Sequence, residues 1–386
     1  MNFARISRPA AIAVAWLAVS GAHAQSHWSK VPVPVYTPTH FVQGVYRYWA
    51  APRAADFATR SAALTPAVQA LCDAPARDAA AGLATARSAW RASAVSWDRL
   101  SAVAIGPLIE RRSQRQIDFT PTRPVLIAKA IDEAPTDAVS MERIGTPAKG
   151  LPALEWLLWK QPLPSGSTAC GYAVQVAADI EREAAALAVA FGQAADRAWD
   201  DEPAAVAAMS EIVNQWVGGV ERLGWDQLDK PVRSAESGKP AYPRGESGGS
   251  AASWAAQWQS LRSLGVVGAS PSNARRQATR GDPGNPAAAR HFVDGTDVAP
   301  APGAALVPLE SYLRGRGSNT VADALARASA RVDVAVSALS ADASRPPVVS
   351  RVLAASARLN TLKQLAENDL APALEVSIGF SDADGD

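Results

Sequence analysis

The segment best suited to chemistry is residues 149–159, KGLPALEWLLW. A glycine and a proline predict a helix start there, and one carboxylate, Glu155, precedes an almost wholly apolar run. Burial raises the pKa of a lone carboxylate, and carboxylates with shifted pKa values gather at functional sites. From its position Glu155 could also cap the free amides of the first helical turn, which the spacing alone favours. We therefore propose Glu155 as a candidate ligand-binding residue, and helix capping is the structural alternative.

Histidine is too scarce to complete the usual catalytic patterns. Three histidines follow residue 24, namely His27, His40 and His291, and the motifs HExxH, HxxE and CxxC are all missing. The usual zinc-hydrolase and serine-hydrolase arrangements are therefore unsupported. A metal site would need oxygen ligands such as Glu155, or His40 brought in from a distance.

A second candidate residue is Arg123, which stands in the proline-rich tract DFTPTRP at residues 118–124. Prolines on both sides restrict the backbone around it, so its side chain is well placed to meet a ligand or a buried carboxylate. The nearby residues Arg111, Arg112 and Arg115 are interpreted as a solvated face.

The segments that must position these residues are predicted to be helices. Apolar residues recur every three to four positions over residues 180–198, 206–223, 321–339 and 348–366. Such stripes, joined by short Pro/Gly loops, predict an all-α fold of two helical bundles. We place the bundles at residues 25–165 and 166–386, with a long Pro/Gly loop around 265–303 in the second. The tryptophans are expected mostly in the core, among them Trp90, Trp97, Trp216 and Trp225.

The N-terminus has the pattern of a cleavable export signal over residues 1–24. Arg5 and Arg8 precede a short apolar stretch, and a small-x-small site predicts cleavage after Ala24. The mature chain is then expected in the bacterial periplasm, without a membrane-spanning segment. In that oxidising compartment the two cysteines, Cys72 and Cys170, favour a disulfide.

The charge balance gives no indication of a polyanionic partner. The chain has 38 basic and 37 acidic residues, so nothing indicates a surface for nucleic acid or an anionic membrane.

At these residues the chain resembles the imelysin family, also described as M75 peptidase-like or iron-regulated protein A-like. The resemblance rests on Trp90-x6-Trp97 with Gly106-Pro107, on the Pro-x-Arg turn ending at Arg123, on residues 150–159, and on the C-terminal residues 378–386. It implies an all-α protein of two bundles, with a site between them near the 150–159 helix. It also implies export and an association with iron acquisition.

The usual family signature is Gly-x-His-x-x-Glu, and here Pro152 stands at the histidine position. Proline offers no lone pair, so a His/Glu metal pair cannot form on this helix. By position the resemblance carries over Glu155 and Arg123. It also places a polar turn near Arg244 and Ser247 as further ligand-binding residues.

Three functions follow as hypotheses. We favour a non-enzymatic periplasmic binding protein associated with iron acquisition, holding a metal or small-molecule ligand between the bundles near Glu155, with iron as the possible cofactor. The alternatives are an M75-type metallopeptidase and a module that binds a protein partner of the cell envelope, for which the 265–303 loop is the candidate surface.

Overall fold

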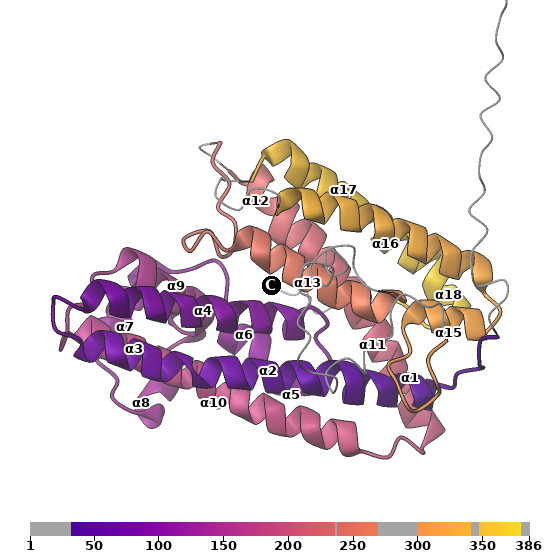
Figure 1. The fold of residues 1–386 in the computed structure, drawn as a ribbon, viewed down its shortest axis with the longest axis horizontal. Coiled ribbons are helices and arrows are strands. Elements are labelled where there is room, and N and C mark those ends of the chain that lie inside the picture. The colour runs from indigo at the N-terminus through magenta and orange to yellow at the C-terminus, as the bar shows by residue number, and fades with distance from the viewer. Residues whose placement is uncertain (1–31, 236–237, 269–298, 341–346, 380–386) are drawn as a thin grey trace, which may run out of the picture.

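The computed structural model describes residues 32–235, 238–268, 299–340 and 347–379 (Figure 1). Every regular element in these ranges is a helix, which confirms the all-α prediction. Three sequence predictions lie wholly or mostly outside the described residues: the export signal at 1–24, the Pro/Gly loop at 265–303, and the C-terminal motif at 378–386. Within the described part, no helix combines the length and the apolar character needed to cross a bilayer.

The first bundle is built on four long helices. They are α2 (Ala51–Ala62), α3 (Leu64–Asp73), α4 (Ala79–Ser101) and α10 (Thr168–Asp196). Helix α10 packs along α2, α3 and α9 (Gly150–Lys160). The apolar stripe of α10 is thus buried against the first half of the chain, and the domain boundary at residue 165 stays a prediction.

Shorter elements complete this half. They are α1 (Pro38–Gly44), the π-helical η2 (Val45–Ala50), α5 (Pro107–Glu110), α6 (Ser113–Ile117), α7 (Pro124–Glu133), α8 (Ala138–Glu142) and the 3-10 turn η3 (Thr146–Ala148).

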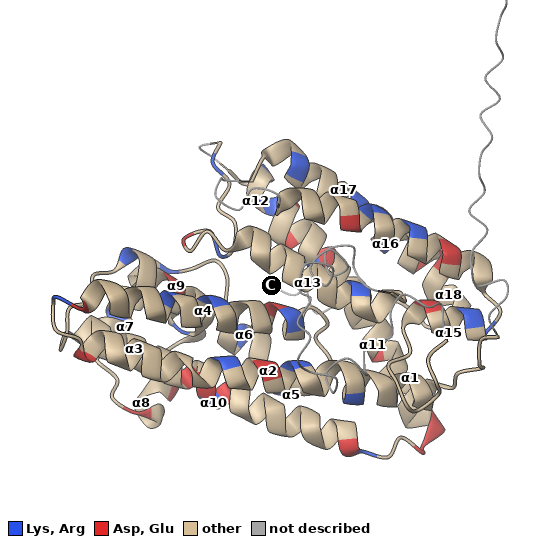
Figure 2. Cartoon of the chain, in the orientation of Figure 1, with Lys and Arg blue, Asp and Glu red and all other residues tan. Residues whose placement is uncertain are grey.

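The second bundle has α11 (Glu202–Arg222), α13 (Ser250–Gly265), α16 (Asn319–Leu339) and α17 (Val349–Leu365) as its main helices. Its shorter elements are η4 (Leu223–Asp229), α12 (Lys230–Arg233), α15 (Leu309–Gly315), η6 (Ala366–Leu370) and α18 (Ala371–Ala373). Figure 1 shows α16 and α17 side by side on the outer face of this bundle. Lys, Arg, Asp and Glu side chains are spread over both bundles (Figure 2).

The two bundles share one continuous hydrophobic core. Helix α13 packs against α4, and α1 packs against α11. The approach of α11 is close: a Cβ added at Gly219 would lie 2.1 Å from the Ala102 carbonyl oxygen, so a side chain cannot fit there. Trp49 Nε1 also donates to the Ser260 carbonyl oxygen at 3.3 Å across the joint. The bundles are therefore fixed to each other by packing as well as by the chain connections.

The cysteines and most of the tryptophans behave as the sequence predicts. Cys72 at the end of α3 and Cys170 in α10 form a disulfide. Trp90, Trp97 and Trp216 are buried. The expectation for Trp225 is wrong, because 47% of its surface is exposed. It lies in η4, where π-helical geometry shifts the register of the helix face.

Candidate ligand-binding site

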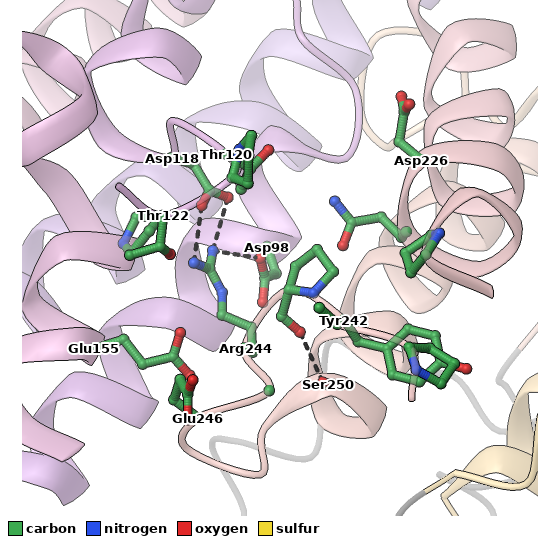
Figure 3. A pocket seen from close by; sticks show the side chains of 18 of the residues that line it. Asp98, Asp118, Thr120, Thr122, Glu155, Asp226, Tyr242, Arg244, Glu246 and Ser250 are labelled. Carbon is green, nitrogen blue, oxygen red and sulfur yellow. Dashed lines mark hydrogen bonds and ion pairs between the residues drawn. The ribbon is translucent and has the colours of Figure 1, made fainter. Parts of the chain in front are cut away.

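A cleft of about 1510 Å³ lies at the joint of the two bundles (Figure 3). Its walls come from the C-terminal end of α4, the turn at 118–124 and α9 on one side. From the other side come the end of α11 with η4, α12, the loop 238–249 and the start of α13. A ligand here would contact both halves of the chain at once.

The start of α9 is fixed by a close backbone approach. Gly150 has φ +73°, and a Cβ there would lie 2.3 Å from the Ile117 carbonyl oxygen. Only glycine fits both demands, so the motif glycine seats α9 against the turn that carries Asp118. Pro152 stands in the first helical turn, where its missing N–H leaves no hydrogen bond unmade.

Glu155 does not cap its own helix. The N-terminus of α9 has no side-chain cap, and Glu155 Oε1 instead accepts a hydrogen bond of 2.8 Å from the backbone N–H of Ser247. The side chain is 4% exposed and lines the cleft. Burial raises the pKa of Glu155, while hydrogen bonding from Ser247 and the charge of Arg244 oppose that shift. The structure thus replaces the capping interpretation with a contact between the bundles.

Arg244 reaches from the loop 238–249 into the first bundle. Its guanidinium donates to both oxygens of Asp118, at 2.8 and 2.7 Å, and to Asp98 Oδ1 at 3.2 Å. Trp97 Nε1 donates to Asp118 Oδ2 at 3.1 Å and orients that carboxylate. Burial alone would lower the pKa of Arg244, but the charges of Asp118, Asp98 and Glu155 together raise it. Arg244 is therefore a permanent cation at the floor of the cleft.

Asp98 is the most deeply placed of these carboxylates, with 3% of the residue exposed. Burial raises its pKa, an effect that Arg244 opposes and Asp118 reinforces. Asp98 Oδ2 and Arg244 Nε are buried without a hydrogen-bond partner among the described residues. The same holds for Gln227 Oε1 and the Tyr242 hydroxyl, which also belong to the lining. The cleft thus concentrates polar atoms whose hydrogen bonds are unmade, which is typical of a binding site.

The loop that carries Arg244 and Ser247 is tied to the first bundle at further points. Lys160 Nζ pairs with Glu246 Oε2 at 2.6 Å, and Arg91 Nη2 donates to the Ser247 carbonyl oxygen at 3.1 Å. Arg244 itself has φ +60°, a left-handed conformation that a non-glycine residue adopts at a cost of about 1–2 kcal/mol. These ties hold the strained turn in place.

Of the four predicted ligand-binding residues, the structure brings Glu155, Arg244 and Ser247 together. Arg123 lies apart: it is exposed at the start of α7 and is not among the lining residues, although Thr122 and Pro124 are. Sequence reasoning missed Asp98 and Asp118. A signal for Asp98 existed, since it directly follows Trp97 on the buried face of α4.

The donor set does not match a conventional metal centre. In the ranges that the structure covers, no three His, Cys, Asp or Glu side chains are grouped so that they could hold a metal ion. His40 forms a capping box with Thr37 at the start of α1, and it does not line the cleft. His27 and His291 lie outside the described residues.

Fold and site together define an all-α protein with a polar cleft at the joint of two bundles. The chain belongs to the imelysin family, whose model, Peptidase_M75, matches residues 50–366. No curated protein sequence matches it significantly.

The solved structures that share the fold include the following two. One is an imelysin-like protein from Psychrobacter arcticum 273-4, with TM-score 0.65, 18% identity, and 91% of this chain and 100% of that chain covered. The other is a putative iron-regulated protein A precursor from Parabacteroides distasonis ATCC 8503, with TM-score 0.57, 14% identity, and 88% and 98% covered.

Proposed function

We propose that this protein is an exported, non-enzymatic binding protein whose ligand occupies the cleft between the bundles, and that it takes part in iron acquisition. The observation that carries the proposal is the convergence of Glu155, Ser247 and Arg244 from opposite sides of the joint. A ligand seated there would bridge both bundles, as ligands do at many interfaces between domains.

The chemistry of the site favours binding over catalysis. A metallopeptidase needs a metal-bound water, which usually requires three protein ligands and a base. Pro152 stands where the family signature has its histidine, and the described residues supply no three-ligand group. The carboxylates already have partners: Asp118 and Asp98 bind Arg244, and Glu155 binds Ser247. The metallopeptidase remains the alternative function.

The iron association and the periplasmic location rest on family and sequence. The similar protein from Parabacteroides distasonis is described as a putative iron-regulated protein A precursor. The export signal predicted for residues 1–24 favours secretion. Among the described residues the floor offers one buried carboxylate oxygen without a hydrogen-bond partner, Asp98 Oδ2. One such oxygen is too few to bind a bare iron ion, but it can hold an organic molecule that carries iron.

Calorimetry on the purified mature chain, with ferrous chloride and with a neutral ferric hydroxamate complex, tests the proposal. We expect binding of an iron species that weakens in Glu155→Ala and persists in Glu142→Ala, whose exposed side chain on α8 does not line the cleft. Equal affinities in the two variants would place the ligand outside the cleft. Metal-dependent cleavage of a peptide library, lost in Glu155→Gln, would favour the metallopeptidase instead.

A further inference from the structure

The floor of the cleft carries an excess of negative charge. We define the acidic floor as Asp98, Asp118 and Glu155, all of which act electrostatically on Arg244. Among the described residues, these three carboxylates face one guanidinium (Figure 3). The nearby Lys160 is committed to Glu246 at 2.6 Å. With all its groups charged, the acidic floor lacks counter-charge in a largely buried place.

Uncompensated charge in a buried site is costly, because few water dipoles surround it. A second observation points to where the missing positive charge would lie. Asp98 is 3% exposed, and its Oδ2 lacks a hydrogen-bond partner within the described part of the chain, although Oδ1 is bound by Arg244. The Ser253 hydroxyl also interacts with this carboxylate, but Oδ2 has no hydrogen-bond partner of normal geometry among the described residues, so it can accept from a ligand. Glu155 Oε1 accepts from Ser247 beside the same arginine.

The surroundings suit an organic cation rather than a metal ion. Trp97, Trp156 and Tyr242 line the cleft with aromatic surface, which attracts ammonium and guanidinium groups. The floor already holds one flat organic cation, since the Arg244 guanidinium lies 5.8 Å from the ring centre of Trp90 while paired with Asp118. The volume of about 1510 Å³ also far exceeds the space that a single ion requires.

We propose that the cleft binds an organic molecule through a protonated amine, seated on the acidic floor beside Arg244 and between Asp98 and Glu155. The inference rests on the proposed function in one respect, that the cleft is the ligand site, and it holds whether or not the ligand serves iron acquisition.

The side of the cleft opposite the acidic floor would determine the orientation of the bound ligand. Arg222 and Lys230 line it near Asp226, with Lys230 Nζ 3.7 Å from Asp226 Oδ1, and Lys239 also belongs to the lining. Figure 3 shows Asp226 and Glu155 on opposite sides of the site. The cations of the lining on this side outnumber its one lining carboxylate, although Glu221 also acts on Arg222. We therefore expect the remainder of the ligand to be neutral or acidic.

The test uses phenethylamine and its neutral isostere phenylethanol, measured by calorimetry on the mature chain at physiological ionic strength. The two probes share an aromatic ring that fits the walls and differ in charge. We expect the amine to bind at least about tenfold more tightly than the alcohol, since a hydrogen bond to a charged group is stronger than one to a neutral group.

Glu155→Gln is the informative variant, because its amide oxygen can still accept the Ser247 N–H while the charge is lost. It should weaken amine binding about tenfold, whereas the matched control Glu142→Gln, at an exposed position of α8 outside the lining, should leave it unchanged. Asp98→Asn provides a second variant, and circular dichroism with thermal melting confirms that each protein is folded.

The outcomes separate the inference from the proposed function. Equal binding of amine and alcohol, or an amine affinity that Glu155→Gln and Asp98→Asn leave unchanged, overturns the inference. Binding of ferrous chloride in the cleft without binding of the amine overturns it too, while the proposed function stands. Binding of neither the amine nor any iron species contradicts both.

Discussion

Replacing Arg244 by methionine tests whether the buried ion network holds the two sides of the cleft together. Methionine retains much of the length of the apolar stem but removes the guanidinium. Three hydrogen bonds to Asp118 and Asp98 are lost, and Asp98 is left buried with neither oxygen bound by a cation.

The size of the expected loss of stability follows from the burial of the Arg244–Asp98 ion pair. The side chains of Arg244 and Asp98 are 3% and 4% exposed, so solvent screens their interaction little. Removing one partner of such a pair typically costs about 3–5 kcal/mol, because the remaining charge stays uncompensated. We expect Arg244→Met to lower the free energy of unfolding by this amount, measured from urea midpoints at an unchanged m value.

Two controls sharpen this measurement. Arg233→Met removes an arginine that also pairs with an aspartate, Asp229, but has a 66% exposed side chain, so it should change stability little. The double variant Asp98→Asn with Arg244→Met should recover part of the loss, because the stranded charge is gone. A loss below about 1 kcal/mol in Arg244→Met, or no recovery in the double variant, would refute the reasoning.

Three further predictions concern stability. Burial raises the pKa of Glu155 in the folded state above its unfolded value, so its stabilising contribution is present at low pH and is lost as pH rises through the folded pKa. Urea unfolding should be measured from below the ordinary carboxyl pKa to above the folded pKa of Glu155. The free energy of unfolding of Glu155→Gln should rise relative to that of the wild type as the pH rises. Gly150→Ala should lower the melting temperature more than Gly166→Ala, because both glycines have φ near +72° but only at Gly150 would a Cβ meet backbone atoms. Replacing Cys72 and Cys170 together by alanine opens a closure of 98 residues and should cost about 2–5 kcal/mol in urea unfolding without reductant.

Each of these has a contrary result. A stability difference between Glu155→Gln and wild type that is flat with pH would mean that burial does not shift this carboxylate. Equal melting temperatures for the two glycine variants would mean that the approach of Ile117 to Gly150 relaxes freely. A double cysteine variant as stable as the wild type, with or without reductant, would show that packing of α3 against α10 suffices.

Local patterns predicted a large part of this protein. The three-to-four spacing of apolar residues predicted the long helices, because a helix must turn one face to the core. The two cysteines predicted the disulfide. The glycine, proline and carboxylate at 150–155 marked α9, and the order of several motifs predicted the imelysin family. Each inference depends on residues that are near one another in sequence, or on order alone.

Tertiary structure decided what Glu155 does and which groups accompany it. Its partner Ser247 is 92 residues away, and Arg244 meets Asp118 and Asp98 across 126 and 146 residues. No periodicity encodes such pairings, because they arise where the loop before α13 crosses the joint. Packing of the bundles also decided the place of Arg123. Its side chain is exposed outside the cleft, although its neighbours Thr122 and Pro124 line the cleft. The sequence determined the helices and the acid at the start of α9, and only the packing of two bundles assembled the charged floor around it.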